Sequence, residues 1–220
     1  MTQSHTLDGK HIRITVGSLV FNEVGEVLMG YPIRDRVNEG WHFSQGGKES
    51  KERALTGSRR ELGEEFGVGR NDVFTIAAIS AQPFYPVPGN KHPEIYHGLI
   101  LGFHAFLMRP GSKINLESRL NGEPPEYKDY RWVELNEVAA ICPAYKAEAY
   151  KPLVAAATPI ADAIKAIHQS GIILPPRKLV QAVRNNSFVA AAFEVGQLAP
   201  RLPRFPGKPY RRPLLREHAA

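Results

Sequence analysis

Residues 46–68 read GGKESKERALTGSRRELGEEFGV and carry more structural information than any other part of this 220-residue chain. The residue pattern predicts a helix over residues 51–66, with Ser50 as its N-cap and Gly67 as the glycine that ends it. At 100° per residue, Leu55, Leu62 and Phe66 fall within about 40° of one another. This narrow apolar stripe predicts that one side of the helix packs on a core.

Three glutamates, Glu61, Glu64 and Glu65, fall within about 100° of one another on a different face of this helix. Like charges one turn apart weaken a helix, and Glu64 and Glu65 lie at its C-terminal end, where the helix dipole disfavours negative charge. The spacing alone leaves two interpretations open. The first is a solvated acidic face moderated by Arg59 and Arg60, and the second is a divalent-cation site, because Mg²⁺ takes clustered oxygen ligands.

The complete pattern favours the cation site. The residues at defined spacings are Gly46, Glu52, Arg60, Glu61, Leu62, Glu64, Glu65, Gly67 and Val68. This set resembles the Nudix box, G-x5-E-x7-R-E-U-x-E-E-x-G-U with U apolar, at every defined position. The chain therefore resembles the Nudix hydrolase family, which implies an α+β fold: an α/β/α sandwich with a mixed β-sheet and a catalytic loop-helix-loop.

The resemblance also implies a chemistry, the hydrolysis of a nucleoside diphosphate linked to another group with Mg²⁺ or Mn²⁺ as cofactor. Such ions neutralise phosphates, lower the pKa of a bound water and orient its attack. The implied metal ligands are the side chains of Glu61, Glu64 and Glu65 and the backbone carbonyl of Gln45. The implied catalytic residues are Glu61, Glu64 and Arg60, and the structural residues of the box are Gly46, Glu52 and Gly67. Glu52 and Arg60 are expected to pair across two helical turns.

Segments outside the box extend the resemblance over roughly residues 11–165. The lead-in WHFSQGG at residues 41–47 is similar to the W-x-F-P-Q-G-G of bacterial RNA pyrophosphohydrolases and diadenosine polyphosphate hydrolases, with Ser44 in place of proline. Residues 124–133 are similar to the P-E-F-x-x-W-R-W-V segment of that group, which implies that Glu126 is a further metal ligand or base. Tyr145-Lys146-x3-Tyr150 resembles its F-K-R-x-x-Y helix.

Three residues are candidates for substrate binding. Arg13 matches an arginine of that group that contacts phosphate. Lys48 follows the glycine pair, where either a phosphate contact or an ordinary surface lysine fits. Tyr85 lies in the expected loop 83–93, where it either stacks on a base or packs locally.

The rest of the chain is expected to form a mixture of strands and a few helices. The expected strands cover residues 12–21, 26–31, 41–43, 73–82, 97–108 and 130–133, and the expected helices cover residues 145–168 and 179–193. We expect residues 1–170 to form the Nudix domain and residues 171–220 a basic, proline-rich extension, extended or disordered from Pro200 onward. That extension has nine Lys or Arg against two Glu, so it accounts for the net charge of +6.

Composition excludes several classes of protein. The chain is 43% hydrophobic and has no window close to 18 apolar residues, so no membrane span is expected. Residues 1–10 lack the apolar region of a secretory signal. The single cysteine, Cys142, excludes an intramolecular disulfide, and a reducing cytoplasm is the expected location.

The leading hypothesis is a metal-dependent pyrophosphohydrolase acting on a dinucleoside polyphosphate or a 5′-triphosphorylated RNA. Its expected partner is a nucleotide-containing pyrophosphate, with RNA as a second partner that the basic extension could contact. Two alternatives stay open: a housekeeping hydrolase of free nucleotides or nucleotide sugars, and a catalytically silent Nudix-fold regulatory or binding protein. The oligomeric state is left open.

Overall fold

The computed structural model of the chain describes residues 4–7, 10–33, 40–81, 83–86, 96–117, 122, 124–186, 189–190 and 198–199. The strands are β1 (Ser4–Leu7), β2 (Lys10–Phe21), β3 (Val27–Pro32), β4 (Ser44–Gly47), β5 (Val73–Ile79), β6 (Phe84–Pro86), β7 (Tyr96–Met108), β8 (Tyr127–Val133) and β9 (Leu198–Ala199). The helices are α1 (Ala54–Phe66), α2 (Val138–Ile141), α3 (Ala144–Gln169) and α4 (Pro176–Asn185), with 3-10 turns at Arg70–Asp72 and Leu135–Glu137. Among these residues, no helix is both long and apolar enough to cross a membrane.

The described strands form one mixed sheet in the order β8-β3-β2-β7-β5-β9, with β1 and β4 pairing on β2 and β6 pairing on β7. The long central strands β2 and β7 run parallel, and the other pairs are antiparallel. Parallel neighbours need a crossover connection, and here the chain between β2 and β7 contains β4, α1 and β5. The crossover therefore carries the box across one face of the sheet.

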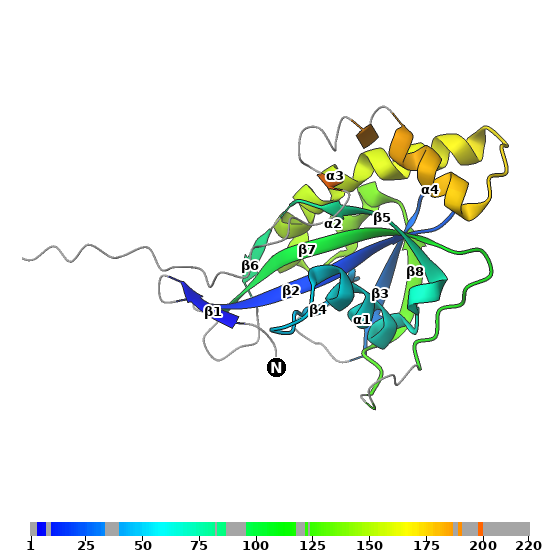
Figure 1. The fold of residues 1–220 in the computed structure, drawn as a ribbon. Coiled ribbons are helices and arrows are strands. Elements are labelled where there is room, and N and C mark those ends of the chain that lie inside the picture. Colours follow the sequence, from blue (N-terminus) through cyan, green and yellow to red (C-terminus); the bar gives the residue numbers. More distant parts are fainter. Residues whose placement is uncertain are drawn as a thin grey trace, which may run out of the picture.

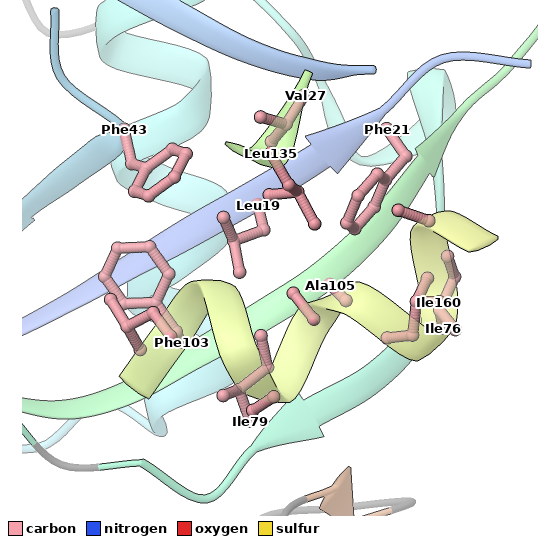
Figure 2. Close-up of a cluster of buried hydrophobic side chains, with 14 of the residues drawn as sticks. Leu19, Phe21, Val27, Phe43, Ile76, Ile79, Phe103, Ala105, Leu135 and Ile160 are labelled. Carbon is pink, nitrogen blue, oxygen red and sulfur yellow. The ribbon is translucent and has the colours of Figure 1, made fainter. Parts of the chain in front are cut away.

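Side chains alternate along the central strands and build a core on each face of the sheet. On β2, Leu19 and Phe21 join the cluster beneath α3, whereas Val20 joins the cluster beneath α1. Figure 1 shows α3 and α1 on opposite sides of the sheet, and Figure 2 shows Leu19 and Phe21 on the α3 side, with Phe21 near Ile160 of that helix. The expected mixed sheet between helical layers is confirmed.

Helix α1 begins later than expected. It starts at Ala54, its N-cap is Arg53, and no side chain caps it, so the predicted start at residue 51 with Ser50 as N-cap is wrong. The carboxylate of Glu52 instead accepts the backbone N–H of Glu49 (2.7 Å) and holds the chain in a turn before the helix. The end is as predicted: Gly67 has φ 64° and donates its N–H to the carbonyl of Gly63.

Helix α3 is continuous over 26 residues although Pro152 and Pro159 lie inside it. Each proline removes a backbone hydrogen bond and costs about 3 kcal/mol in a helix interior. The apolar face of the helix, which includes the fully buried Leu153 and Ile160, offsets this cost by packing on the sheet.

The first part of the C-terminal extension packs on the sheet. Arg184 of α4 donates hydrogen bonds to the carbonyls of Ile76 and Thr75 (2.8 Å each), and β9 pairs with the end of β5. Val180 and Val183 of α4 belong to the core beneath α3. The predicted helix over residues 179–193 is present in part: α4 covers Pro176–Asn185, residues 189–190 are also helical, and residues 187–188 and 191–193 lie outside the described residues. The expectation for Pro200 onward lies outside the described residues.

Other expectations were tested by the structure. The strands expected at residues 12–21, 26–31, 73–82, 97–108 and 130–133 are confirmed as β2, β3, β5, β7 and β8 with shifted bounds. In place of a strand at residues 41–43, His42 forms an isolated bridge with Gly30 and the strand begins at Ser44. The expected loop 83–93 is wrong at its start, where β6 pairs with β7. Strands β1 and β9 were not predicted.

Candidate active site

The box folds as strand β4, a turn and helix α1, and β4 is held against the central strand β2. This arrangement brings Gly46 of β4 against Glu61 of α1. A Cβ atom on Gly46 would lie 2.0 Å from Glu61 Oε2, so any other residue would displace this carboxylate. Glycine at position 46 thus allows the Glu61 carboxylate to lie directly against the strand.

Arg60 joins the acidic residues of the box to the strand. It donates to both oxygens of Glu52, one of them at 2.9 Å, and its Nη2 also donates to the carbonyl of Gly47 at 2.8 Å. Its Nη1 donates to Glu61 at 2.8 Å and to Glu64 at 2.9 Å. The expected pairing of Glu52 with Arg60 is present, but Glu52 lies in the turn before α1, so the pair does not span two helical turns.

Two of the box glutamates are buried, and burial governs their protonation. Burial raises the pKa of Glu61 to about 7; Arg60 lowers it, and the charges of Glu64 and Glu126 raise it further. Glu65 is only 2% exposed, and burial, followed by the charges of Glu126 and Glu61, holds its pKa well above the ordinary value. A positive charge brought to this face would lower both pKa values and favour the ionised carboxylates.

Glu126 and Tyr127 come to the same place from another element. Glu126 directly precedes β8, and its charge raises the pKa of both Glu61 and Glu65, so its carboxylate lies on the same side as theirs. The buried Tyr127 hydroxyl donates to Glu65 Oε1 at 3.3 Å. Among the described atoms, Glu65 Oε2 forms no hydrogen bond of good geometry; the nearby Ser44 hydroxyl, which also lacks one, lowers the pKa of Glu65. One oxygen of this buried glutamate is therefore under-coordinated.

Behind these carboxylates lies a chain of polar side chains. Tyr150 donates to Gln45 Oε1 at 2.9 Å, and Gln45 Nε2 donates to the Tyr85 hydroxyl at 2.8 Å. This chain fixes the side chain of Gln45, the residue whose backbone carbonyl is the predicted ligand.

Sequence reasoning missed Tyr127, His42 and the buried Lys146 as site residues. Nζ of Lys146 lies 2.9 Å from Nδ1 of His42, and its charge lowers the pKa of Glu65. The sequence held two signals that could have identified site residues. Tyr127 directly follows the candidate ligand Glu126, and Lys146 lies one helical turn before Tyr150 in the segment that resembles the F-K-R-x-x-Y helix.

The three substrate-binding candidates are placed differently. Arg13 is exposed on β2. Burial raises the pKa of Tyr85, and the charge of Arg13 partly opposes that rise. Nζ of Lys48 donates to the carbonyl of Glu49 at 2.8 Å, so its amine lies against the backbone of its own turn. Tyr85 is 6% exposed and its hydroxyl is bonded to Gln45, so its ring packs locally in this structure, and its role in substrate binding stays a prediction. The exposed aromatic of β6 is Phe84, at 43%.

The carboxylates do not converge into a finished metal site. Across the described ranges, no three His, Cys, Asp or Glu side chains are arranged so that they could hold a metal ion. The reason is visible in the hydrogen bonds, because Arg60 Nη1 holds one oxygen of Glu61 and one of Glu64. The donor chemistry nevertheless suits a hard divalent cation, since the groups are carboxylates and Glu65 keeps an unpaired oxygen.

Comparison with known proteins agrees with this geometry. The model of the NUDIX domain matches residues 11–156. An RNA pyrophosphohydrolase of Sphingopyxis alaskensis is 31% identical over 147 residues, covering 64% of this chain and 90% of the relative. The RNA pyrophosphohydrolase of Novosphingobium aromaticivorans is 28% identical over 148 residues, covering 66% and 92%. Among solved structures, an Ap4A hydrolase binary complex from C. elegans covers 73% of this chain and 99% of its own at 13% identity and a TM-score of 0.48.

The match to the family model covers more than half of the chain and contains the complete box from Gly46 to Val68. The structure places that box on β4 and α1, with its arginine and glutamates in direct contact. The chain therefore belongs to the NUDIX family of hydrolases.

Proposed function

We propose that this hydrolase cleaves a phosphoanhydride bond in the 5′-triphosphate of RNA and that it requires Mg²⁺ or Mn²⁺. The observation that carries the proposal is the buried Glu65, which has one oxygen without a hydrogen-bond partner among the described residues and lies beside the charges of Glu61 and Glu126. Such a carboxylate needs a cation to be stable in its ionised form. The relatives named RNA pyrophosphohydrolase, at 28–31% identity, support RNA as the substrate.

The cation would be held by Glu61, Glu64, Glu65 and Glu126 and the backbone carbonyl of Gln45. When bound, it supplies charge neutralisation of the phosphates and activation of a water. Because Glu61 and Glu64 are both bonded to Arg60, we expect at least one of them to exchange Arg60 for the cation.

The chain's own residues supply positioning. Arg60 keeps its bonds to Glu52 and Gly47, so it continues to tie α1 to the end of β4 when a glutamate leaves it. A glutamate of the pair Glu61 and Glu64 accepts the proton of the attacking water, and the anhydride oxygen leaves with the departing phosphate. Arg13 and Lys48 are proposed to contact the phosphate chain, the latter after its amine leaves the carbonyl of Glu49.

The test is product release with Mg²⁺ and then Mn²⁺ from a matched panel of 5′-triphosphorylated RNA, diadenosine tetraphosphate, ADP-ribose and free nucleoside triphosphates. Each substrate is offered to the wild type, to Glu64→Gln and to Glu23→Gln, which removes an exposed carboxylate in the turn between β2 and β3. We expect RNA to be preferred, Glu64→Gln to lose turnover while it stays folded, and Glu23→Gln to match the wild type.

Three other results would overturn parts of this proposal. Preference for the dinucleotide or a free nucleotide would overturn the assignment of RNA as the substrate, but not the assignment of metal-dependent phosphoanhydride hydrolysis. Full turnover by Glu64→Gln would remove the assigned role of the box glutamates. Absence of metal-dependent turnover on the whole panel, together with no Mn²⁺ binding in calorimetry, would favour a regulatory or binding protein.

A further inference from the structure

A hollow lies between α1 and the turn that contains Arg70. It has a volume of about 370 Å³ and is lined mainly by Arg59, Arg60, Gly63, Glu64 and Arg70. Arg60 and Glu64 also belong to the acidic face of the box, so the hollow adjoins the candidate active site. It extends beyond that site, because Arg59 and Arg70 line it whereas Glu61 and Glu65 do not.

Two of the cations that line this hollow are not paired with an acid among the described residues. The third, Arg60, is bonded to Glu52, Glu61 and Glu64, so its charge is compensated. Arg59 and Arg70 remain, and within the described part of the chain neither forms an ion pair with a carboxylate. The nearby Asp72 is engaged elsewhere, since its two oxygens accept from the N–H of Gly69 and the hydroxyl of Ser112.

Arg59 is held in place but is not fully satisfied as a donor. Its Nη2 donates to Thr75 Oγ1 at 2.8 Å, and its guanidinium lies 5.9 Å from the centre of the Phe106 ring. Its Nε is buried and has no hydrogen-bond partner among the described residues. Burial first, and then the charge of Arg70, lowers the pKa of Arg59. Two neighbouring guanidinium groups that no carboxylate pairs within the described residues are an arrangement that an anion would stabilise.

We propose that Arg59 and Arg70 bind a backbone phosphate of the RNA substrate, downstream of the 5′ end that is hydrolysed. A guanidinium offers paired donors that match phosphate oxygens. Glu64 belongs to both the box and the lining of the hollow, so a chain that enters the active site with its 5′ end can continue into the hollow toward Arg59 and Arg70. This inference rests on RNA being the substrate in the proposed function.

Binding without turnover tests the hollow directly. The probe is a fluorescent decanucleotide RNA with a 5′-hydroxyl, which offers backbone phosphates and no hydrolysable anhydride. We expect Arg70→Gln to weaken its binding about tenfold and to reduce the slope of log Kd against log salt by about 0.7. Arg70 is exposed, so this variant is expected to fold.

Two further variants sharpen the binding test. Arg59→Lys keeps the charge but removes the planar guanidinium with its paired donors, and we expect it to weaken binding as well. Arg177→Gln removes an exposed arginine of α4, outside the hollow and inside the basic C-terminal segment, and we expect binding within about twofold of the wild type. Equal losses in Arg177→Gln and Arg70→Gln would mean that diffuse charge carries RNA binding, and would overturn the proposal.

Turnover separates a backbone phosphate from the reacting phosphates or a free phosphate ion. With a 5′-triphosphorylated decanucleotide, we expect Arg70→Gln to raise KM and leave kcat unchanged. With a nucleoside triphosphate, which has no downstream phosphate, we expect no change in either constant. A change in KM on both substrates, or inorganic phosphate at millimolar concentration displacing the RNA from wild type and Arg70→Gln alike, would overturn the proposal.

The two proposals fail in different ways. If no pyrophosphate substrate is turned over but the 5′-hydroxyl RNA still depends on Arg70, the hydrolytic proposal falls and the phosphate site stands. If RNA is hydrolysed and binding is indifferent to Arg59 and Arg70, the phosphate site falls alone.

Discussion

Helices α1 and α3 cover opposite faces of one sheet with different chemistry. Helix α1 buries the carboxylates of Glu61 and Glu65 and contacts the sheet partly through polar pairs, such as Ser58 Oγ at 2.9 Å from Nδ1 of His104. Helix α3 buries mainly apolar side chains, including Ile160. The free energy gained by burying an apolar side chain does not depend on pH, whereas the free energy of burying a carboxyl or an imidazole group depends on its protonation. The contribution of the α1 face to stability should therefore vary with pH and bound cations, whereas that of the apolar part of α3 around Ile160 should not.

The largest effect is expected from Glu65→Gln on α1. Loss of a proposed metal ligand should reduce metal-dependent turnover by more than about a hundredfold. The metal-free protein should become more stable by about 1 kcal/mol or more, because a buried carboxylate without a cation is removed. Turnover and urea unfolding, each with and without Mn²⁺, measure the two effects.

The pH dependence of that gain has a definite sign. The pKa of Glu65 is raised above its ordinary 4.5, so as pH rises the unfolded chain ionises this carboxyl before the folded chain does. The metal-free wild type therefore loses stability above pH 4.5, and the advantage of Glu65→Gln grows from pH 5 to pH 8. Mn²⁺ should stabilise the wild type and not the variant. An advantage that is constant with pH would contradict the proposed difference between the two faces.

Ile160→Ala tests the other helix. Ile160 of α3 is fully buried between the helix and the sheet, and its truncation to alanine should lower the free energy of unfolding by about 3–4 kcal/mol. The turnover number of the folded protein should stay within about twofold, because the side chain touches no residue of the acidic face. Urea unfolding and kcat well below the transition give both values. The control is Ile172→Ala, which truncates an exposed isoleucine at 60% exposure and should cost less than about 0.5 kcal/mol.

The features that could be predicted from the sequence are those that depend on neighbouring residues along the chain. Helical spacing was enough to predict that Glu61, Glu64 and Glu65 share a face, because this depends on local geometry along one helix. The pairing of Glu52 with Arg60 was implied by the resemblance to the Nudix box and is present, although Glu52 lies in the turn before the helix. The long strands β2 and β7 were also predictable from continuous apolar residues.

Features that depend on long-range contacts were not predictable. Strand β6 lies in a proline-rich segment and forms because it pairs with β7. Tyr85 can be buried because Gln45, 40 residues away, donates a hydrogen bond to its hydroxyl. The late start of α1 follows from Glu52, whose carboxylate is shared by Glu49 and Arg60. In each case a distant or competing partner outweighs the local preference.

His104 should give the α1 face a second, opposite pH dependence. Burial, and then the charge of Arg59, lowers the pKa of His104 from 6.5 to about 4. Above pH 6.5 the ring is neutral in the folded and the unfolded chain. Between pH 6.5 and pH 4 the ring binds a proton in the unfolded chain but stays neutral in the folded chain. Stability should thus fall between pH 6.5 and pH 4, by about 3 kcal/mol in total.

NMR titration of the His104 ring and urea unfolding at pH 7, 6, 5 and 4 measure this effect. Compared with the wild type, His104→Gln should lose that part of the slope, while the cost of Ile160→Ala should be equal at each pH. A ring that titrates near 6.5 would show that the contact with Ser58 does not exclude the charged form.

The smallest effects are expected where the two helices end alike. Gly67 follows α1 with φ 64° and Gly171 follows α3 with φ 69°, both in the left-handed region. Alanine at either position should cost about 1 kcal/mol, and asparagine less. At Gly171 a Cβ would meet nothing within 4 Å, so only the backbone contributes. At Gly67 the last turn of α1 carries Glu64 and Glu65, so a strained end displaces the proposed ligands. Equal losses of stability with a loss of turnover in Gly67→Ala alone would show that the same helix ending serves only stability on α3 and also the site on α1.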